Sequence, residues 1–307
     1  MRRKQRLTIT LTPDLVRQID RLIDKRTVRS RSHAIEMLLR RTLAPTVETA
    51  VLLAGGPGEA DDVPALTTIR GEALISLTIR HLMSAGIRSF VILAGDNEAA
   101  IRQVLGEGSR PESRLATRIH YVREDKPLGT AGALKQAEPL LAGGPFLMVH
   151  ADVLTNIDIE SFINFHMREN TLATIAVKPR QAERQYGKVL LEGNRILEFI
   201  EKGDNQGISI VNTGVYLFRP EILSLIDADG PSHLETDVFP RLAGMRELGA
   251  FLFQGIWFDI STPENRGLAE ARWCQDGGYG HVRYEANRDE PVEPESNRQA
   301  DGLPSAG

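Results

Sequence analysis

The sequence predicts a small basic strand–helix–helix unit followed by a mostly parallel α/β domain. Residues 49–276 alternate short apolar runs with amphipathic helical patterns, as expected for a sheet with flanking helices. Residues 1–43 hold twelve Lys and Arg against four Asp and Glu, a net charge of +8, whereas the rest of the chain has a net charge of −12. The 307 residues suit about two domains. The basic unit is therefore expected to have an anionic partner.

Composition excludes several classes of protein. Apolar runs such as residues 146–149 are far too short to span a bilayer. The basic start, residues 1–4, has no apolar segment behind it and does not resemble a signal peptide. The single cysteine, Cys274, excludes a disulfide framework and a Cys-rich zinc site. We therefore expect a soluble, cytoplasmic protein with no membrane partner.

Residues 6–11 alternate polar and apolar side chains and predict a strand. One face would carry Arg6, Thr8 and Thr10, and the other Leu7, Ile9 and Leu11. Thr12-Pro13-Asp14 predicts the start of a first helix, and Ser30 predicts the cap of a second. The apolar stripes expected on these helices are Leu15, Ile19, Leu22 and Ile23, then Ile35, Leu38, Leu39 and Leu43. A unit of this size needs a partner to be stable, which predicts a dimer.

Over its whole length this unit resembles the ribbon-helix-helix repressors. The resemblance implies binding to duplex DNA by a homodimer or a higher even oligomer, with a two-stranded ribbon in the major groove. It implies that Arg6, Thr8 and Thr10 face base edges, and that amides near Ser30 and Arg31 hold a phosphate. Two alternatives stay open. The unit could serve only to dimerise the domain behind it, and its charge could be an ordinary solvated surface.

Residues 44–48 predict a linker, and residues 49–276 begin with a buried strand over 50–53 that runs into a glycine loop. Further elements are expected as a helix over 74–87, a strand over 90–93, a loop and helix start over 127–134, and a strand over 146–149. Asp152 and Asp259 follow two of the predicted strands. Carboxylates at strand ends make a plausible Mg²⁺ site, although a turn or cap explains either one alone.

Eight strings in this region resemble, in family order, the sugar-1-phosphate nucleotidyltransferases, with mannose-1-phosphate guanylyltransferases nearest. They are Leu53-Ala54-Gly55-Gly56-x-Gly58, Pro127-Leu128-Gly129-Thr130-Ala131, Val149-His150-Ala151-Asp152, Tyr186-Gly187, Phe199-Ile200-Glu201-Lys202, Asn212-Thr213-Gly214-Val215-Tyr216, Asp237-Val238-Phe239-Pro240 and Trp257-Phe258-Asp259-Ile260-x-Thr262-Pro263-Glu264. The resemblance implies the nucleotide-diphospho-sugar transferase fold, a Rossmann-like mixed, mostly parallel sheet with flanking helices.

The resemblance also implies roles for particular residues. Asp152 and Asp259 would hold Mg²⁺ on the phosphates, and Lys202 would pair with the sugar phosphate as the third catalytic residue. The nucleotide-binding residues would be Leu53, Ala54, Gly55, Gly56, Gly58, Gly129 and Thr130. The sugar-binding residues would be Tyr186, Gly187, Glu201 and Asn212. The implied reaction is in-line attack of a sugar-1-phosphate oxygen on the nucleotide α-phosphate, with release of pyrophosphate.

The glycine loop departs from the family, whose loop continues G-x-G-T-R-L with a P-K-x-L soon after. Here residues 58–66 form a shorter loop without either basic residue, and it carries Glu59, Asp61 and Asp62 instead. These carboxylates would repel a triphosphate. Arg70 lies close by in the sequence and could substitute.

Two hypotheses therefore stay open. The first is a DNA-binding regulator whose transferase-like domain binds a nucleotide or nucleotide sugar. The second is an active nucleotidyltransferase that its N-terminal unit dimerises. Residues 277–307 are polar, rich in acidic residues and proline and poor in aliphatic side chains, and predict a disordered tail. The absence of both basic residues from the glycine loop favours the first hypothesis, a DNA-binding regulator.

Overall fold

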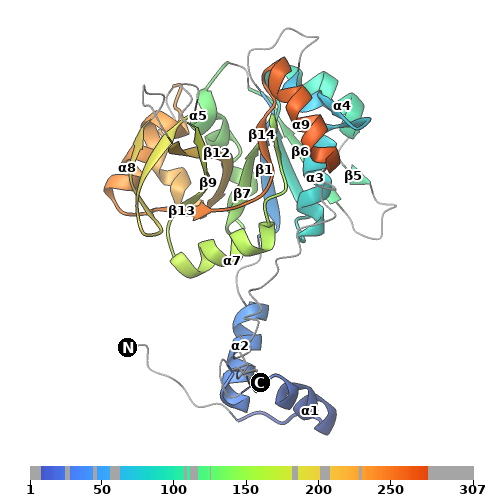
Figure 1. Ribbon diagram of the computed structural model, residues 1–307, viewed down its shortest axis with the longest axis vertical. Helices are drawn as coiled ribbons and strands as arrows, with labels where there is room; N and C mark the ends of the chain where they lie inside the picture. Colours follow the sequence, from blue (N-terminus) through green and yellow to red (C-terminus); the bar gives the residue numbers. More distant parts are fainter. Residues whose placement is uncertain are drawn as a thin grey trace, which may run out of the picture.

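The computed structural model describes residues 8–24, 28–43, 47–55, 63–106, 109–110, 117–124, 126–181, 186–200, 208–227 and 230–275. The predicted tail lies outside the described residues. Figure 1 shows two N-terminal helices, α1 (Pro13–Arg21) and α2 (Arg31–Leu43), next to a larger α/β domain. Within the described part of the chain, no helix is long and apolar enough to cross a membrane.

Local sequence signals explain where α1 and α2 begin. Pro13 occupies the first turn of α1, and Asp14 places a negative charge at the positive end of the helix dipole. Thr12 precedes α1 as predicted, but its side chain makes no capping bond, and only its carbonyl accepts, from the Val16 amide at 3.1 Å. The Ser30 hydroxyl does cap α2, because it accepts from the His33 amide at 3.2 Å.

The N-terminal unit buries only part of its apolar surface within one chain. Ile19, Val28 and Ala34 form a small core. The prediction that both apolar stripes are buried is partly wrong for the single chain, since four of their residues are exposed, namely Leu15, Leu22, Leu38 and Leu39. Residues 8–12 form no strand either, although a strand was expected over 6–11. A ribbon takes its hydrogen bonds from a second strand, so one copy of the chain cannot complete it.

A ten-stranded mixed sheet, with strand order β10-β11-β13-β9-β12-β7-β1-β4-β6-β5, organises the α/β domain. Parallel pairing joins β7, β1, β4 and β6, and it also joins β9 to β13. Antiparallel strands build the rest of the sheet, beginning where β12 pairs with β7. The strand bounds are β1 (Thr49–Leu53), β4 (Ser89–Leu93), β5 (Ser109–Arg110), β6 (Thr117–Val122), β7 (Phe146–His150), β9 (Ala173–Gln181), β10 (Lys188–Glu192), β11 (Arg195–Ile200), β12 (Ile208–Phe218) and β13 (Leu248–Leu252).

Helices cover both faces of this sheet, so the central strands are apolar on both sides. Alternate residues of β1 face opposite cores: Leu52 packs with α3 (Leu74–Ser84) and α7 (Ile159–Glu169), and Val51 packs with α5 (Gly129–Gln136) and α8 (Phe239–Gly244). The remaining helical segments are α4 (Glu98–Leu105), α6 (Glu138–Leu141), α9 (Pro263–Gln275), η1 (Pro64–Leu66), η2 (Gly95–Asn97), η3 (Pro220–Leu225) and η4 (Leu234–Val238).

The start of the α/β domain includes two residues that the sequence assigned to the linker. Val47 is buried in the core beside Ala50. The Glu48 carbonyl accepts from the amides of Arg88 and Ser89 at 3.0 Å each. The rest of the predicted linker, residues 44–46, lies outside the described part of the chain.

A small two-stranded sheet brings the C-terminal part of the α/β domain next to the segment that follows β7. β8 (Val153–Thr155) pairs antiparallel with β14 (Trp257–Asp259), which sets Asp259 opposite Val153. Helix α9 follows β14, and the Thr262 hydroxyl caps it by accepting from the Asn265 amide at 3.3 Å. A hairpin of β2 (Thr68–Ile69) and β3 (Glu72–Ala73) turns at Arg70, which is exposed and has positive φ.

The buried His166 of α7 predicts acid sensitivity of the fold. Its Nδ1 lies 2.7 Å from the Thr174 hydroxyl, and burial, aided by the charge of Arg219, lowers the pKa of His166 to about 4. Above about pH 6.5 the ring is neutral in both folded and unfolded chains. Below it the unfolded chain binds a proton that the folded chain does not, so stability is lost by roughly 2 kcal/mol at pH 5.

Urea unfolding at pH 7 and pH 5 measures this loss. His166→Gln is expected to lose roughly 2 kcal/mol less than the parent between these pH values. His120→Gln replaces an exposed histidine of β6 and is the matched control. An equal pH dependence in the parent and both variants would contradict the prediction.

Candidate functional site

A cavity of about 710 Å³ opens beside the carboxyl ends of the parallel strands. Open α/β sheets bind ligands at this edge. Four of the predicted nucleotide-binding residues line it, namely Leu53, Gly55, Gly129 and Thr130. Ala54 is buried and donates its amide to the Leu93 carbonyl at 2.9 Å. Gly56 and Gly58 lie outside the described residues.

The start of α5 forms one wall of the cavity and is tied to the segment before η4. The amides of Ala131 and Gly132 donate to the Ser232 carbonyl at 3.0 and 3.1 Å, and the Ser232 amide donates to the Leu128 carbonyl at 2.8 Å. Gly129 has a φ of +73°, and a Cβ there would lie 2.5 Å from the Ser232 carbonyl oxygen. Because two amides of the first turn are used inside the protein, this wall suits a base better than a phosphate.

The four titratable residues that line the cavity were not predicted from the sequence. Asp96 follows β4 and Glu124 follows β6, while Lys126 and His233 come from the loops beside α5. The signal that could have identified Asp96 and Glu124 as site residues is that each follows one of two adjacent parallel strands. The Glu124 carboxylate accepts from the Leu128 amide at 3.1 Å, which fixes it at the cavity. Apolar atoms of Pro127, Ala133 and Pro231 complete the lining.

Asp152 and Asp259 are brought together as the sequence predicted. Asp152 follows β7, Asp259 ends β14, and the Ile260 amide donates to the Asp152 carbonyl at 2.9 Å. Burial raises the pKa of the Asp152 carboxyl, and the negative charge of Asp259 raises it further, whereas His150 opposes the shift. Two crowded carboxylates are the arrangement that a divalent cation stabilises.

The donor set fits Mg²⁺, which usually takes one or two carboxylates together with phosphate oxygens. Within the described part of the chain, no group of three or more His, Cys, Asp or Glu gathers to hold a metal. A cation here would therefore depend on ligand oxygens to complete its coordination. The role of both aspartates as metal ligands stays a prediction.

The predicted sugar-binding residues come from β12 and the segment before β10. Tyr186 is buried, and its ring centroid lies 5.1 Å from that of Trp257. The Gly187 carbonyl accepts from the Asn212 amide at 2.9 Å. The Asn212 side chain is held at both ends, donating to the Tyr216 hydroxyl at 2.9 Å and accepting from the Gly214 amide at 3.1 Å. Glu201 and Lys202 lie outside the described residues.

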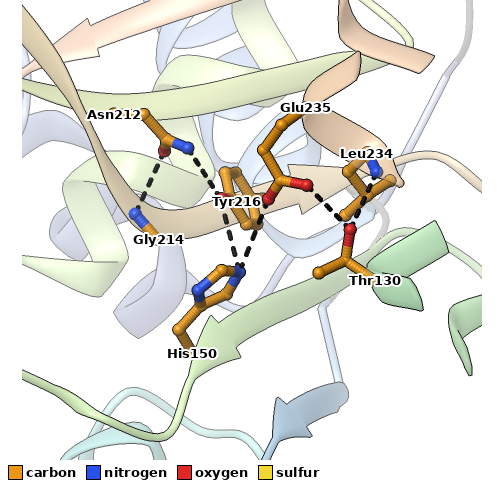
Figure 2. A network of polar contacts seen from close by, with 7 residues as sticks. All are labelled: Thr130, His150, Asn212, Gly214, Tyr216, Leu234 and Glu235. Atoms are coloured by element: carbon orange, nitrogen blue, oxygen red, sulfur yellow. Dashed lines mark hydrogen bonds and ion pairs between the residues drawn. The ribbon is translucent and has the colours of Figure 1, made fainter. Parts of the chain in front are cut away.

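Figure 2 shows polar contacts that connect Thr130 with Asn212. The Thr130 hydroxyl donates to Glu235 at 2.8 Å and accepts from the Leu234 amide at 2.8 Å. Its hydrogen is therefore already used inside the protein. The other Glu235 oxygen lies 4.0 Å from His150 Nε2, which lies 3.5 Å from the Tyr216 hydroxyl. The sequence suggested no role for His150, Tyr216 or Glu235.

On the N-terminal unit, Thr8 and Thr10 are exposed, and Arg6 lies outside the described residues. Arg31 makes two contacts with Asp20, at 2.6 and 2.8 Å, and the hydrogen bond from Arg31 lowers the pKa of Asp20. The Arg31 guanidinium is therefore engaged within the unit. A phosphate contact at this place would rest on the α2 backbone more than on the Arg31 side chain.

The fold and the strand-end site define a nucleotide-sugar transferase architecture, and family models agree. The model described as "Nucleotidyl transferase" matches residues 49–271, and the chain therefore belongs to this family. The model described as "Ribbon-helix-helix protein, copG family" matches residues 5–44. Both resemblances inferred from the sequence are confirmed.

Among individual relatives, the chain is similar to the mannose-1-phosphate guanylyltransferase catalytic subunits beta of Drosophila melanogaster and Danio rerio. The identities are 30% and 29%, over 70% of this chain in both cases. The match spans about 60% of the length of those relatives.

Solved structures show the same fold. HddC from Yersinia pseudotuberculosis complexed with GMP-PN matches with a TM-score of 0.62 and 21% identity, over 74% of this chain and all of that one. A UDP-glucose pyrophosphorylase complexed with UDP-glucose matches with a TM-score of 0.62 and 16% identity, over 75% of this chain and all of that one.

Proposed function

We propose that this protein is a DNA-binding regulator whose transferase-like domain binds a nucleotide sugar as effector, with little or no transferase activity. The observation that carries the proposal is that one part of the expected site is present and another part is missing. A cavity large enough for a nucleotide, a pair of carboxylates and a held Asn212 are present, whereas the sequence of the glycine loop lacks the Arg and Lys expected from the family. Such a site suits recognition of a product-like ligand better than turnover.

The lining of the cavity favours a guanine nucleotide. Guanine presents the N1–H and N2–H donors side by side, and a carboxylate accepts from such a pair. Glu124 and Asp96 supply carboxylates, with apolar atoms of Leu53, Pro127 and Pro231 available to cover the ring faces. The guanylyltransferase names of the relatives support the same base. We therefore propose a GDP-sugar as ligand, with GDP-mannose as the first candidate.

A thermal-shift experiment tests this proposal. GDP-mannose with Mg²⁺ at about 100 times its Kd stabilises the native state by about 2.7 kcal/mol, which corresponds to a rise in Tm of roughly 5–10 °C. Asp152→Asn and Asp259→Asn are expected to remove the Mg²⁺-dependent part. Asp227→Asn, an exposed carboxylate after η3, is the matched control. Absence of any shift with GDP-, UDP- and dTDP-sugars would overturn the effector model and the enzyme model together.

An active nucleotidyltransferase is the second candidate, and the carboxylate pair supports it. Asp152 and Asp259 would hold Mg²⁺, which supplies charge neutralisation on the phosphates when bound. The cavity would align the nucleotide for in-line attack, a reaction that needs alignment and no covalent intermediate. Pyrophosphate release separates the two candidates.

A further inference from the structure

Glu235 occupies the centre of the polar contacts drawn in Figure 2. Its side chain is 14% exposed, and it is the second residue of a turn of π-helix, η4, that packs against α5 and α8. One carboxylate oxygen accepts from Thr130 and the other faces His150. A buried carboxylate is costly unless it is partnered, so these contacts constrain where α5 lies relative to the end of β7.

The groups at the two ends of these contacts belong to different parts of the site. Thr130 lies on the cavity wall, next to Gly129. Asn212 lies on β12 on the predicted sugar side, and His150 stands two residues before Asp152. Tyr216 connects the two sides, because its hydroxyl contacts both Asn212 and His150. Glu235 is thus the one link from the cavity wall to this sugar-side group among the contacts drawn in Figure 2.

We propose that Glu235 is a positioning residue that couples recognition of the two halves of the ligand, so that the nucleotide and sugar sides bind cooperatively. This inference rests on the proposed binding of a nucleotide sugar. Distant substitutions without shared partners have multiplicative effects on Kd, usually within about 2-fold, whereas members of one network deviate from the product. A link through Glu235 therefore predicts a deviation that depends on Glu235.

A double-mutant cycle measures the coupling. Kd for GDP-mannose is determined by calorimetry for the parent, Thr130→Val, Asn212→Ala and the double variant, and again for all four in the presence of Glu235→Gln. We expect the double variant to deviate from the product of the single effects by about 5-fold or more in the parent background. With Glu235→Gln the deviation is expected to fall below about 2-fold. Glu221→Gln, an exposed carboxylate of η3, is the matched control background and should keep the full deviation.

The possible failures are distinguishable. If the parent binds GDP-mannose and the effects simply multiply, the coupling role of Glu235 is wrong and the proposed function stands. A deviation that survives Glu235→Gln assigns the coupling to other residues and also overturns the role. If Glu235→Gln does not fold, the cycle is repeated with Thr130→Ser, which keeps the hydroxyl and its bond to Glu235, and the deviation with Asn212→Ala must then fall below about 2-fold. If the parent binds no nucleotide sugar, the proposed function fails and this inference fails with it.

Discussion

Pyrophosphate release is expected to be very slow for every pair of nucleoside triphosphate and sugar-1-phosphate. Loss of one preorganised donor typically costs about 10²–10³-fold in rate, and the family places two basic groups on the glycine loop that this sequence lacks. Enzymes turn over at a median of about 10 per second, so turnover here should lie below about 10⁻² per second. A coupled phosphate assay over several bases and sugars measures it.

The structure supports this expectation at the described positions around the loop. Pro64 or Ala65 stands where the family has its loop lysine, and Ala65 is buried. Arg70 is exposed at the tip of a hairpin. Among the described residues that line the cavity, Lys126 is the one permanent cation, against the two carboxylates Asp96 and Glu124. A triphosphate brings about four negative charges, of which one Mg²⁺ offsets only part. GDP-mannose should therefore bind more tightly than GTP.

A restoration experiment separates the loop from other causes. Ala60→Arg returns one basic residue at the position where the family has it, and Ala60→Gln is the uncharged control. We expect the arginine variant alone to raise pyrophosphate release, by about 10-fold or more. Turnover of about 1–10³ per second in the parent would refute the regulator model. Arg70→Ala would then identify the substitute cation.

Much of the fold could be predicted because its signals are local. The apolar runs of β1, β4 and β7 and the capped start of α2 depend on neighbouring residues alone. The proximity of Asp152 and Asp259 was expected from two strand ends, but the structure achieves it through the antiparallel pairing of β8 with β14, which sets Asp259 opposite Val153.

The contacts that Thr130, His150 and Glu235 make in Figure 2 could not be predicted, because they join distant positions. Thr130 and Glu235 are 105 residues apart in the chain, and His150 and Tyr216 are 66 apart. A lone histidine or glutamate carries no local pattern that names its partner. Leu15 and Leu39 are exposed in the single chain, and their apolar character alone does not tell whether the same chain or the expected partner chain covers them.

The N-terminal unit is expected to bind duplex DNA as a dimer, with affinity that falls steeply as salt rises. A net charge of +8 per unit attracts phosphates, and the acidic remainder of the chain is screened beyond about 8 Å at physiological salt. About six phosphate contacts per dimer would cost about 10³-fold in affinity between 50 and 200 mM salt. Selection from a random duplex pool, followed by anisotropy titrations, gives the preferred sequence and the salt dependence.

Base reading is tested on the polar side chains of the predicted ribbon. Replacing Arg6, Thr8 and Thr10 together by alanine should remove a sequence preference of about 10²-fold or more and leave the dimer intact, because the apolar residues of the ribbon are unchanged. Arg17→Ala removes one charge from α1 and should weaken all duplexes alike. Deleting residues 1–43 should abolish DNA binding and lower the mass measured by light scattering, while the α/β domain keeps its thermal shift with GDP-mannose. If the triple variant and the parent bind every duplex equally, the base-reading role is wrong and dimerisation is the role left for the unit.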